Sequence, residues 1–134
     1  MKNEKTSAPQ GSSLGVDEGK LAPCKSSPNC VSSQAEGKHY LAPLGYEKLK
    51  EANRIIVEII KELPTAEIVE KKKNYIRAEV RSKLFKFVDD LEFYFSEAEK
   101  KIHFRSAARS GYWDLGVNKR RIKDIKEKYA KYKR

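Results

Sequence analysis

The feature that most constrains the fold is a change of hydrophobic period at Pro64. Before it, residues 46–63 repeat apolar side chains at helical spacing with charged residues between them. This pattern is typical of an amphipathic helix packed on a core. Pro64 ends such a helix because it has no N–H to donate and its ring clashes with the preceding turn. After it, apolar and polar residues alternate, as in strands with one buried face.

Four strand segments follow the helix and are joined by short polar turns, one of them the run of residues 71–74 (KKKN). The segments are residues 67–70, 75–82, 91–95 and 101–105. In the second, the even-numbered residues 76, 78 and 80 are apolar and share one face, which is expected to be buried. His103 is expected to face solvent. Residues 84–88 are apolar and fit either a fifth strand or a crossing loop.

Residues 118–131 carry a thin apolar stripe of Ile122, Ile125 and Tyr129, which predicts a second helix with Asn118 as its N-cap. The order is then helix, strands, helix. Because short turns join the strands, the sheet is expected to be an antiparallel meander of four or five strands. The fold class is therefore predicted to be α+β, a two-layer sandwich with both helices on one face of the sheet.

Size and composition predict one domain preceded by a polar leader. Residues 1–20 of the 134 are rich in Ser, Gly, Lys and Glu, so they are expected to be disordered, and residues 21–134 form the domain. No apolar run is long enough to span a bilayer, and the first residues show no secretion signal. The default expectation is a cytoplasmic monomer; a location in the cell envelope requires a signal that was removed.

The net charge of +10 is concentrated near the C-terminus. Between residues 117 and 134, nine Lys and Arg residues stand against Asp124 and Glu127, a local charge of +7. A solvated helix face explains this pattern, and so does contact with an anionic membrane surface. Nucleic acid is not expected as a partner, because no RNA- or DNA-binding motif accompanies the charge.

Cys24 and Cys30 are the only two cysteines. The Pro–Asn turn between them can bring their Cα atoms within bridging distance, and we favour a disulfide over two free thiols. No metal and no cofactor are expected. The cysteine spacing is longer than that of a zinc knuckle, and only His39 and His103 are present to add histidine ligands.

A second polar segment, residues 105–121, reads RSAARSGYWDLGVNKRR and enters the last helix. Cations at a helix start oppose the helix dipole unless an anion is near. We therefore predict an anion-accepting site built from backbone N–H and guanidinium groups. The candidate residues are Asp89, Asp90, Arg105, Arg109, Asp114, Asn118 and Arg120. No catalytic residue is assigned, because no set of nucleophile, base and orienting group is visible.

The sequence is compatible with three functions. The first is a non-enzymatic binding or accessory module that holds a small anionic ligand at this site. The second is a small hydrolase-like enzyme with Asp89, Asp90 or Asp114 as its base, although adjacent strand residues point to opposite faces, so Asp89 and Asp90 are not expected to share a pocket. The third is a basic protein that docks on membrane or polyanion through residues 117–134. In a structural alternative, the arginines pair with Asp89 or Asp90 and only hold the loop in place.

The sequence resembles domain-of-unknown-function family 1499, whose members are commonly small bacterial proteins. The resemblance rests on residues 23–33 (PCKSSPNCVSS), the Pro-Leu pair at 43–44, residues 87–93 (FVDDLEF) and residues 105–121, in that order. It implies that the Cys loop, the Asp pair and the Arg–Asp–Asn segment belong together, and it supplies no activity. Many members carry export or lipoprotein signals, and no such signal is visible here.

Overall fold

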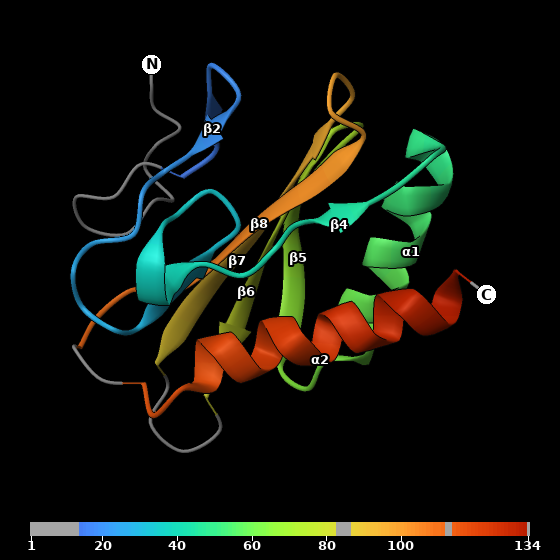
Figure 1. Ribbon diagram of the computed structural model, residues 1–134. Coiled ribbons are helices and arrows are strands. Elements are labelled where there is room, and N and C mark those ends of the chain that lie inside the picture. The colour runs from blue at the N-terminus through green and yellow to red at the C-terminus, as the bar shows by residue number, and fades with distance from the viewer. Residues whose placement is uncertain (1–13, 83–86, 112–113, 134) are drawn as a thin grey trace.

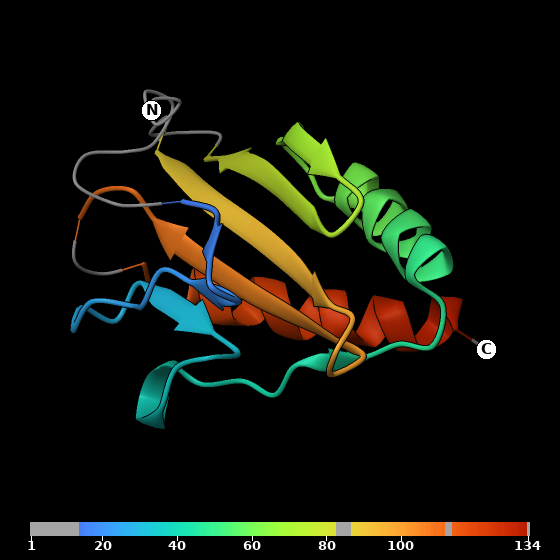
Figure 2. The same cartoon turned by 90° about the horizontal axis from the view of Figure 1, so that it is seen from above.

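The computed structural model describes residues 14–82, 87–111 and 114–133. It shows an antiparallel sheet with both helices packed on one face (Figures 1 and 2). In chain order the elements are β1 (Val16–Asp17), β2 (Lys20–Leu21), β3 (Cys30–Ser32), a 3-10 turn (Gly37–His39), β4 (Leu44–Gly45), α1 (Leu49–Glu62), β5 (Ala66–Lys72), β6 (Tyr75–Arg81), β7 (Val88–Ser96), β8 (Lys101–Ala108) and α2 (Val117–Tyr132).

The predicted α+β class and the four-stranded meander are confirmed, because β5, β6, β7 and β8 pair in sequence order. The main sheet nevertheless has six strands. β3 pairs with the end of β8 and β4 with its beginning, giving the order β3-β8-β7-β6-β5 with β4 also on β8. The two added strands have three and two residues, too few for an alternating pattern to mark them. Of the ambiguous run at 84–88, residues 84–86 lie outside the described residues, and Val88 begins β7.

The core lies between the sheet and the helices. Alternation places one face of each meander strand inward, and helical spacing does the same for α1 and α2. The largest side chains with less than 2% exposure are Phe93, Phe95, Phe104, Ile55, Ile56, Ile59, Ile60, Ile76, Leu91, Ile102, Ile122 and Ile125. Burying each of them stabilises the fold by roughly 1.5–3 kcal/mol before the entropy of ordering is subtracted. The predicted helical stripes are thus the buried surfaces of both helices.

The helix starts differ from the sequence prediction. α1 begins at Leu49 rather than at residue 46, because Tyr46 is held to the sheet edge: its N–H donates to the Lys100 carbonyl at 3.1 Å and its hydroxyl to the Ser96 carbonyl at 3.1 Å. The N-cap of α2 is Gly116, at φ 78°, and not Asn118, which is the second helical residue and is buried. Neither helix has the length and apolar character needed to cross a bilayer.

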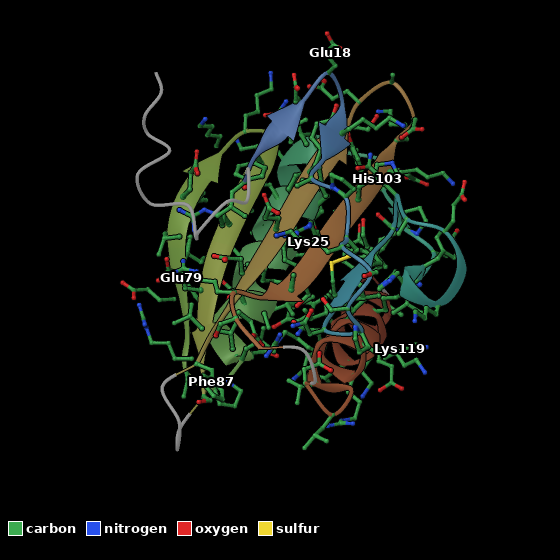
Figure 3. All side chains as sticks on the ribbon, turned by 90° about the vertical axis from the view of Figure 1, so that its left-hand side faces the viewer. Glu18, Lys25, Glu79, Phe87, His103 and Lys119 are labelled. Atoms are coloured by element: carbon green, nitrogen blue, oxygen red, sulfur yellow. A yellow bond between two sulfur atoms is a disulfide. The ribbon has the colours of Figure 1, made fainter. Side chains whose placement is uncertain are left out.

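The face opposite the helices is partly covered, over β7, β8 and part of β6 (Figure 3). The β1–β2 hairpin lies over it, and the Gly15 N–H donates to Glu92 Oε2 at 2.7 Å. Of the predicted disordered leader, residues 1–13 lie outside the described chain, but residues 14–20 are described and contain β1. That end of the leader is therefore ordered, because the sheet offers it hydrogen-bond partners.

His103, predicted to face solvent, is buried on this covered face. Its Nδ1 shares a hydrogen bond with Ser33 Oγ at 3.0 Å, and its Nε2 shares one with Glu99 Oε1 at 2.7 Å. The ring also stacks on Tyr94, with ring centroids 6.4 Å apart. The prediction was wrong because the strand pattern gives the face of a residue, whereas the cover over that face comes from residues distant in sequence.

Candidate functional site

A row of charged side chains crosses the covered face of the sheet. Arg77 of β6 is paired with Glu92 of β7, which is paired with Arg105 of β8. The three are buried, with exposed fractions of 5%, 0% and 7%. Opposite charges on paired strand positions attract, and burial removes the water that would screen them. The row therefore alternates positive, negative, positive across three strands.

The neighbouring row places two carboxylates side by side. Glu79 and Asp90 are directly paired on β6 and β7, an arrangement that is unfavourable without a cation. Arg109, just after β8, supplies it: Nε donates to Asp90 Oδ2 at 2.8 Å and Nη2 to Glu79 Oε2 at 2.6 Å. The hydrogen bond to Asp90 is the largest cause of a raised pKa for Arg109. Arg77 adds a longer bond, from Nη1 to Asp90 Oδ1 at 3.3 Å.

Glu92 is the most deeply buried carboxylate of this face. Its Oε2 accepts hydrogen bonds from the Tyr75 hydroxyl at 2.6 Å and from the Gly15 N–H at 2.7 Å. Its Oε1 lies 3.7 Å from Arg105 Nη1, beyond hydrogen-bond distance. Burial raises the pKa of Glu92, and these partners only partly oppose the shift. Burial likewise raises the pKa of the Tyr75 hydroxyl.

Two buried side-chain atoms in the described chain, Glu92 Oε1 and Arg105 Nε, have no hydrogen-bond partner. An unsatisfied buried polar atom costs about 1–3 kcal/mol. Each such atom in a folded protein requires an explanation, and a bound water or ion is one of them. Arg105 is the more informative of the two because it also lines a cavity.

This cavity, of about 230 Å³, lies between the Cys loop (residues 24–30) and the end of β8. We call it the Arg105 cavity. Its lining residues are Lys25, Ser27, Asn29, Cys30, Asp90, Arg105, Ala107, Ala108, Arg109, Ser110 and Gly111. In Figure 3, Lys25 and the disulfide of the Cys loop lie in front of the strands. The favoured disulfide between Cys24 and Cys30 is present, with Cα atoms 5.7 Å apart.

Asn29 joins the Cys loop to the segment after β8. Its Nδ2 donates to the Gly111 carbonyl at 2.7 Å, and its carbonyl accepts from the Ala108 N–H at 3.0 Å. The same carbonyl accepts from Asn118 Nδ2 at 3.3 Å. The two remote segments that the family resemblance associated therefore meet beside Asp90.

The start of α2 is occupied by a carboxylate of the chain itself. Asp114 Oδ1 accepts from the Gly116 N–H at 2.8 Å, and Oδ2 accepts from the Asn118 N–H at 3.2 Å and from Asn118 Nδ2 at 2.8 Å. Asn118 Oδ1 in turn accepts from Ser106 Oγ at 2.6 Å. A negative group at a helix N-terminus compensates the dipole and the cations around it. Asp114 therefore supplies the negative group that the sequence predicts at this helix start.

Asp89 lies on the helix side of the sheet, away from Asp90. Arg121 Nη2 donates to its Oδ2 at 3.0 Å. Burial raises the pKa of Asp89, and Arg121 opposes the shift. Asp89, Asp114 and Arg121 line a second cavity of about 290 Å³. Strand alternation therefore separates the two neighbouring aspartates, as expected.

The predicted candidates divide into three groups. Asp90, Arg105 and Arg109 line the Arg105 cavity. Asp89, Asp114 and Asn118 lie around the start of α2. Arg120 is exposed, and its Nη1 donates to the Leu115 carbonyl at 2.8 Å. The ion pair between Arg109 and Asp90 agrees with the structural alternative, in which the arginines pair with Asp89 or Asp90 and hold the loop in place.

Sequence reasoning missed several residues of the site. They are Arg77, Glu79, Glu92, Arg121, Lys25 and Asn29. Charged residues at alternate positions of an antiparallel strand usually face solvent, so the strand pattern does not mark these residues as a site. The available signal was the number of charges of both signs on one face of three adjacent strands.

No group of three or more His, Cys, Asp and Glu side chains within the described residues gathers as metal ligands would. The sequence from residue 20 to residue 128 matches a family described as a protein of unknown function, DUF1499. The chain belongs to the DUF1499 family. The match includes the Cys loop, the charged rows and the start of α2, so the Arg105 cavity lies within the family region. A comparison with curated proteins finds no match.

Proposed function

We propose that this domain is a non-enzymatic binding module that accepts a small oxyanion, a phosphate or carboxylate group, in the Arg105 cavity. The observation that carries the proposal is the Nε of Arg105, which has no partner among the described residues although the side chain is buried and lines the cavity. A guanidinium group binds oxyanions through charge-assisted hydrogen bonds. A bound oxyanion would satisfy this donor.

The charge of the lining supports an anionic ligand. Lys25, Arg105 and Arg109 line the cavity against one carboxylate, Asp90, a local charge of +2. Arg109 is bonded to Asp90 and Glu79, so Lys25 and Arg105 are the cations proposed to meet the ligand. The volume of about 230 Å³ exceeds the ~30 Å³ that one water occupies in the liquid, so a phosphate-sized group fits.

The hydrogen bonds that the three aspartates accept favour a binding function over hydrolysis. Asp90 accepts from Arg109, Asp89 accepts from Arg121, and Asp114 accepts from the backbone of α2. A general base needs an acceptor atom within reach of the proton that it removes. Each of these carboxylates instead holds two elements of the fold together, which is a structural use.

The proposal is tested by isothermal titration with inorganic phosphate and with acetate. The variants are Arg105→Gln, Lys25→Ala and Arg120→Gln. Loss of a charge-assisted hydrogen bond of about 1.5–3 kcal/mol corresponds to a weakening of roughly 10- to 100-fold. We expect that loss for Arg105→Gln and a smaller one for Lys25→Ala, whose exposed position keeps the fold intact.

Arg120→Gln is the matched control, since Arg120 is an exposed arginine at the start of α2 and outside the cavity. It is expected to bind as the wild type does. Absence of binding by the wild type, or loss of binding only in Arg120→Gln, would overturn the proposal.

A further inference from the structure

The turn between β5 and β6 forms a second basic feature, separate from the Arg105 cavity. Lys71, Lys72 and Lys73 of this turn and Lys50 of α1 line an open hollow of about 610 Å³, together with Leu49 and Asn53. We call it the lysine hollow. Its described lining holds four lysines and no carboxylate.

The backbone of the hollow is held in place by Asn53. Its Nδ2 donates to the carbonyl groups of Lys72 and Lys73, each at 3.2 Å. This contact fixes the turn against the first half of α1, and Figure 2 shows the two side by side. The lysines of the turn and of the helix therefore share one surface.

Most of the positive charge of the hollow is uncompensated. Lys72 Nζ lies 3.1 Å from Glu70 Oε2. Within the part of the chain that the structure describes, Lys50, Lys71 and Lys73 make no ion pair, and all are exposed. Like charges gathered on one surface repel each other and attract an extended negative partner.

We propose that the lysine hollow docks the protein on the surface of an anionic lipid bilayer. Lysine is a mobile point charge on a flexible apolar stem, which suits headgroups that are not fixed in position. The stems and the half-buried Leu49 offer apolar contact beneath the charges. Single-stranded nucleic acid would instead require aromatic side chains for base stacking, and none of the described residues that line the hollow is aromatic.

The alternative use of these lysines follows from the position of β5, which is an edge strand of the main sheet. Lysines on an edge strand discourage pairing with another chain. In that case, replacing them would cause self-association and would leave membrane binding unchanged. The two uses therefore predict different results for one set of variants.

The test is co-sedimentation of the protein with vesicles of phosphatidylcholine, with and without phosphatidylglycerol. The variant K71E/K72E/K73E is compared with K119E/K123E/K131E, which carries the same charge change on exposed residues of α2. Each lysine near an anionic surface contributes about fivefold in affinity, so neutralising three corresponds to about 100-fold, and replacing them by Glu, which also reverses the charge, corresponds to at least that loss. We expect that loss for the turn variant and no comparable loss for the α2 variant.

A second variant, K50Q/K73Q, keeps the side chains polar and is expected to lose about 25-fold by the same arithmetic. K50Q/K73Q provides the test of the lysine hollow if K71E/K72E/K73E folds poorly. Four outcomes would overturn the proposal: no binding by the wild type, equal binding to neutral vesicles, equal losses in the turn and α2 variants, or self-association of the turn variant with vesicle binding intact. Binding to anionic vesicles that weakens as salt is raised supports it.

Discussion

Arg109 bridges Asp90 and Glu79, donating from Nε to Asp90 at 2.8 Å and from Nη2 to Glu79 at 2.6 Å. The two carboxylates come from neighbouring strands, and Arg109 follows a third. One guanidinium group therefore ties the segment after β8 to β6 and β7. It also forms part of the wall of the Arg105 cavity.

Arg109→Gln is expected to destabilise the fold by about 2 kcal/mol, because it leaves two adjacent, largely buried carboxylates without this cation. The free energy of unfolding from urea denaturation measures the loss. Arg54→Gln is the matched control: Arg54 pairs with Glu51 at 2.8 Å, and both side chains are 55% exposed. A pair of that kind contributes about 0–1 kcal/mol. Equal losses in the two variants would contradict the structural role of Arg109.

Asn118→Asp tests the start of α2. Asn118 Nδ2 lies 2.8 Å from Asp114 Oδ2, so a carboxylate at this position replaces a donor by a second buried negative group. We expect a loss of at least about 2 kcal/mol in the free energy of unfolding at neutral pH. Asn53→Asp, at a less buried position with 3.2 Å bonds, is expected to cost about 1 kcal/mol or less. A smaller effect for Asn118→Asp would mean that the contact with Asp114 does not hold the helix start.

The pH dependence of stability reports on Glu92. Burial raises its folded-state pKa above the unfolded value of about 4.3. Its stabilising contribution is therefore complete below that unfolded value and is lost as pH rises through the folded-state pKa. Glu92→Gln removes this titration while Tyr75, Arg105 and Asp90 stay in place.

The stability of Glu92→Gln relative to the wild type is therefore expected to increase as pH rises from about 4 to neutrality. Urea denaturation of both proteins across this range measures the difference. A difference that is constant with pH, or that shrinks as pH rises, would show that the pKa of Glu92 is not raised.

Reduction of the Cys24–Cys30 disulfide is expected to lower the free energy of unfolding by about 2 kcal/mol, the loop-entropy value for so short a loop. It is also expected to weaken phosphate binding, because Lys25, Ser27 and Asn29 line the Arg105 cavity from this loop. Titration with and without dithiothreitol measures the second effect. A C24A/C30A variant, which has no disulfide to reduce, controls for the reductant and should not respond to it. Phosphate affinity that is unchanged on reduction would show that the loop does not form the site.

The layers of the fold follow from local patterns. Alternation in residues 75–82 predicts β6 and its buried face, and the apolar stripe before Pro64 predicts α1. These patterns are readable because each element is long enough to repeat its period. β3 and β4 are too short to repeat a period. Their pairing with β8 depends on contacts between residues far apart in sequence.

The candidate site was only partly predictable for the same reason. The chemistry of Arg105, Arg109 and Asp90 is visible in the sequence, and so is the proximity of the Cys loop through the family resemblance. The burial of Glu92 is not visible in the sequence, because its cover includes Gly15, in a segment whose composition is typical of disorder. The sequence also predicts Asp114 as part of a ligand site, whereas in the structure Asp114 itself accepts hydrogen bonds from the start of α2.

The most direct measurement is the arginine Nε–H NMR spectrum during a titration with inorganic phosphate. If the Arg105 cavity holds an oxyanion, the Nε–H resonance of Arg105 will shift saturably, and that of the exposed Arg120 will stay in place. If the Arg105 resonance does not respond, or if only Arg120 and other exposed arginines respond, the cavity is not an anion site.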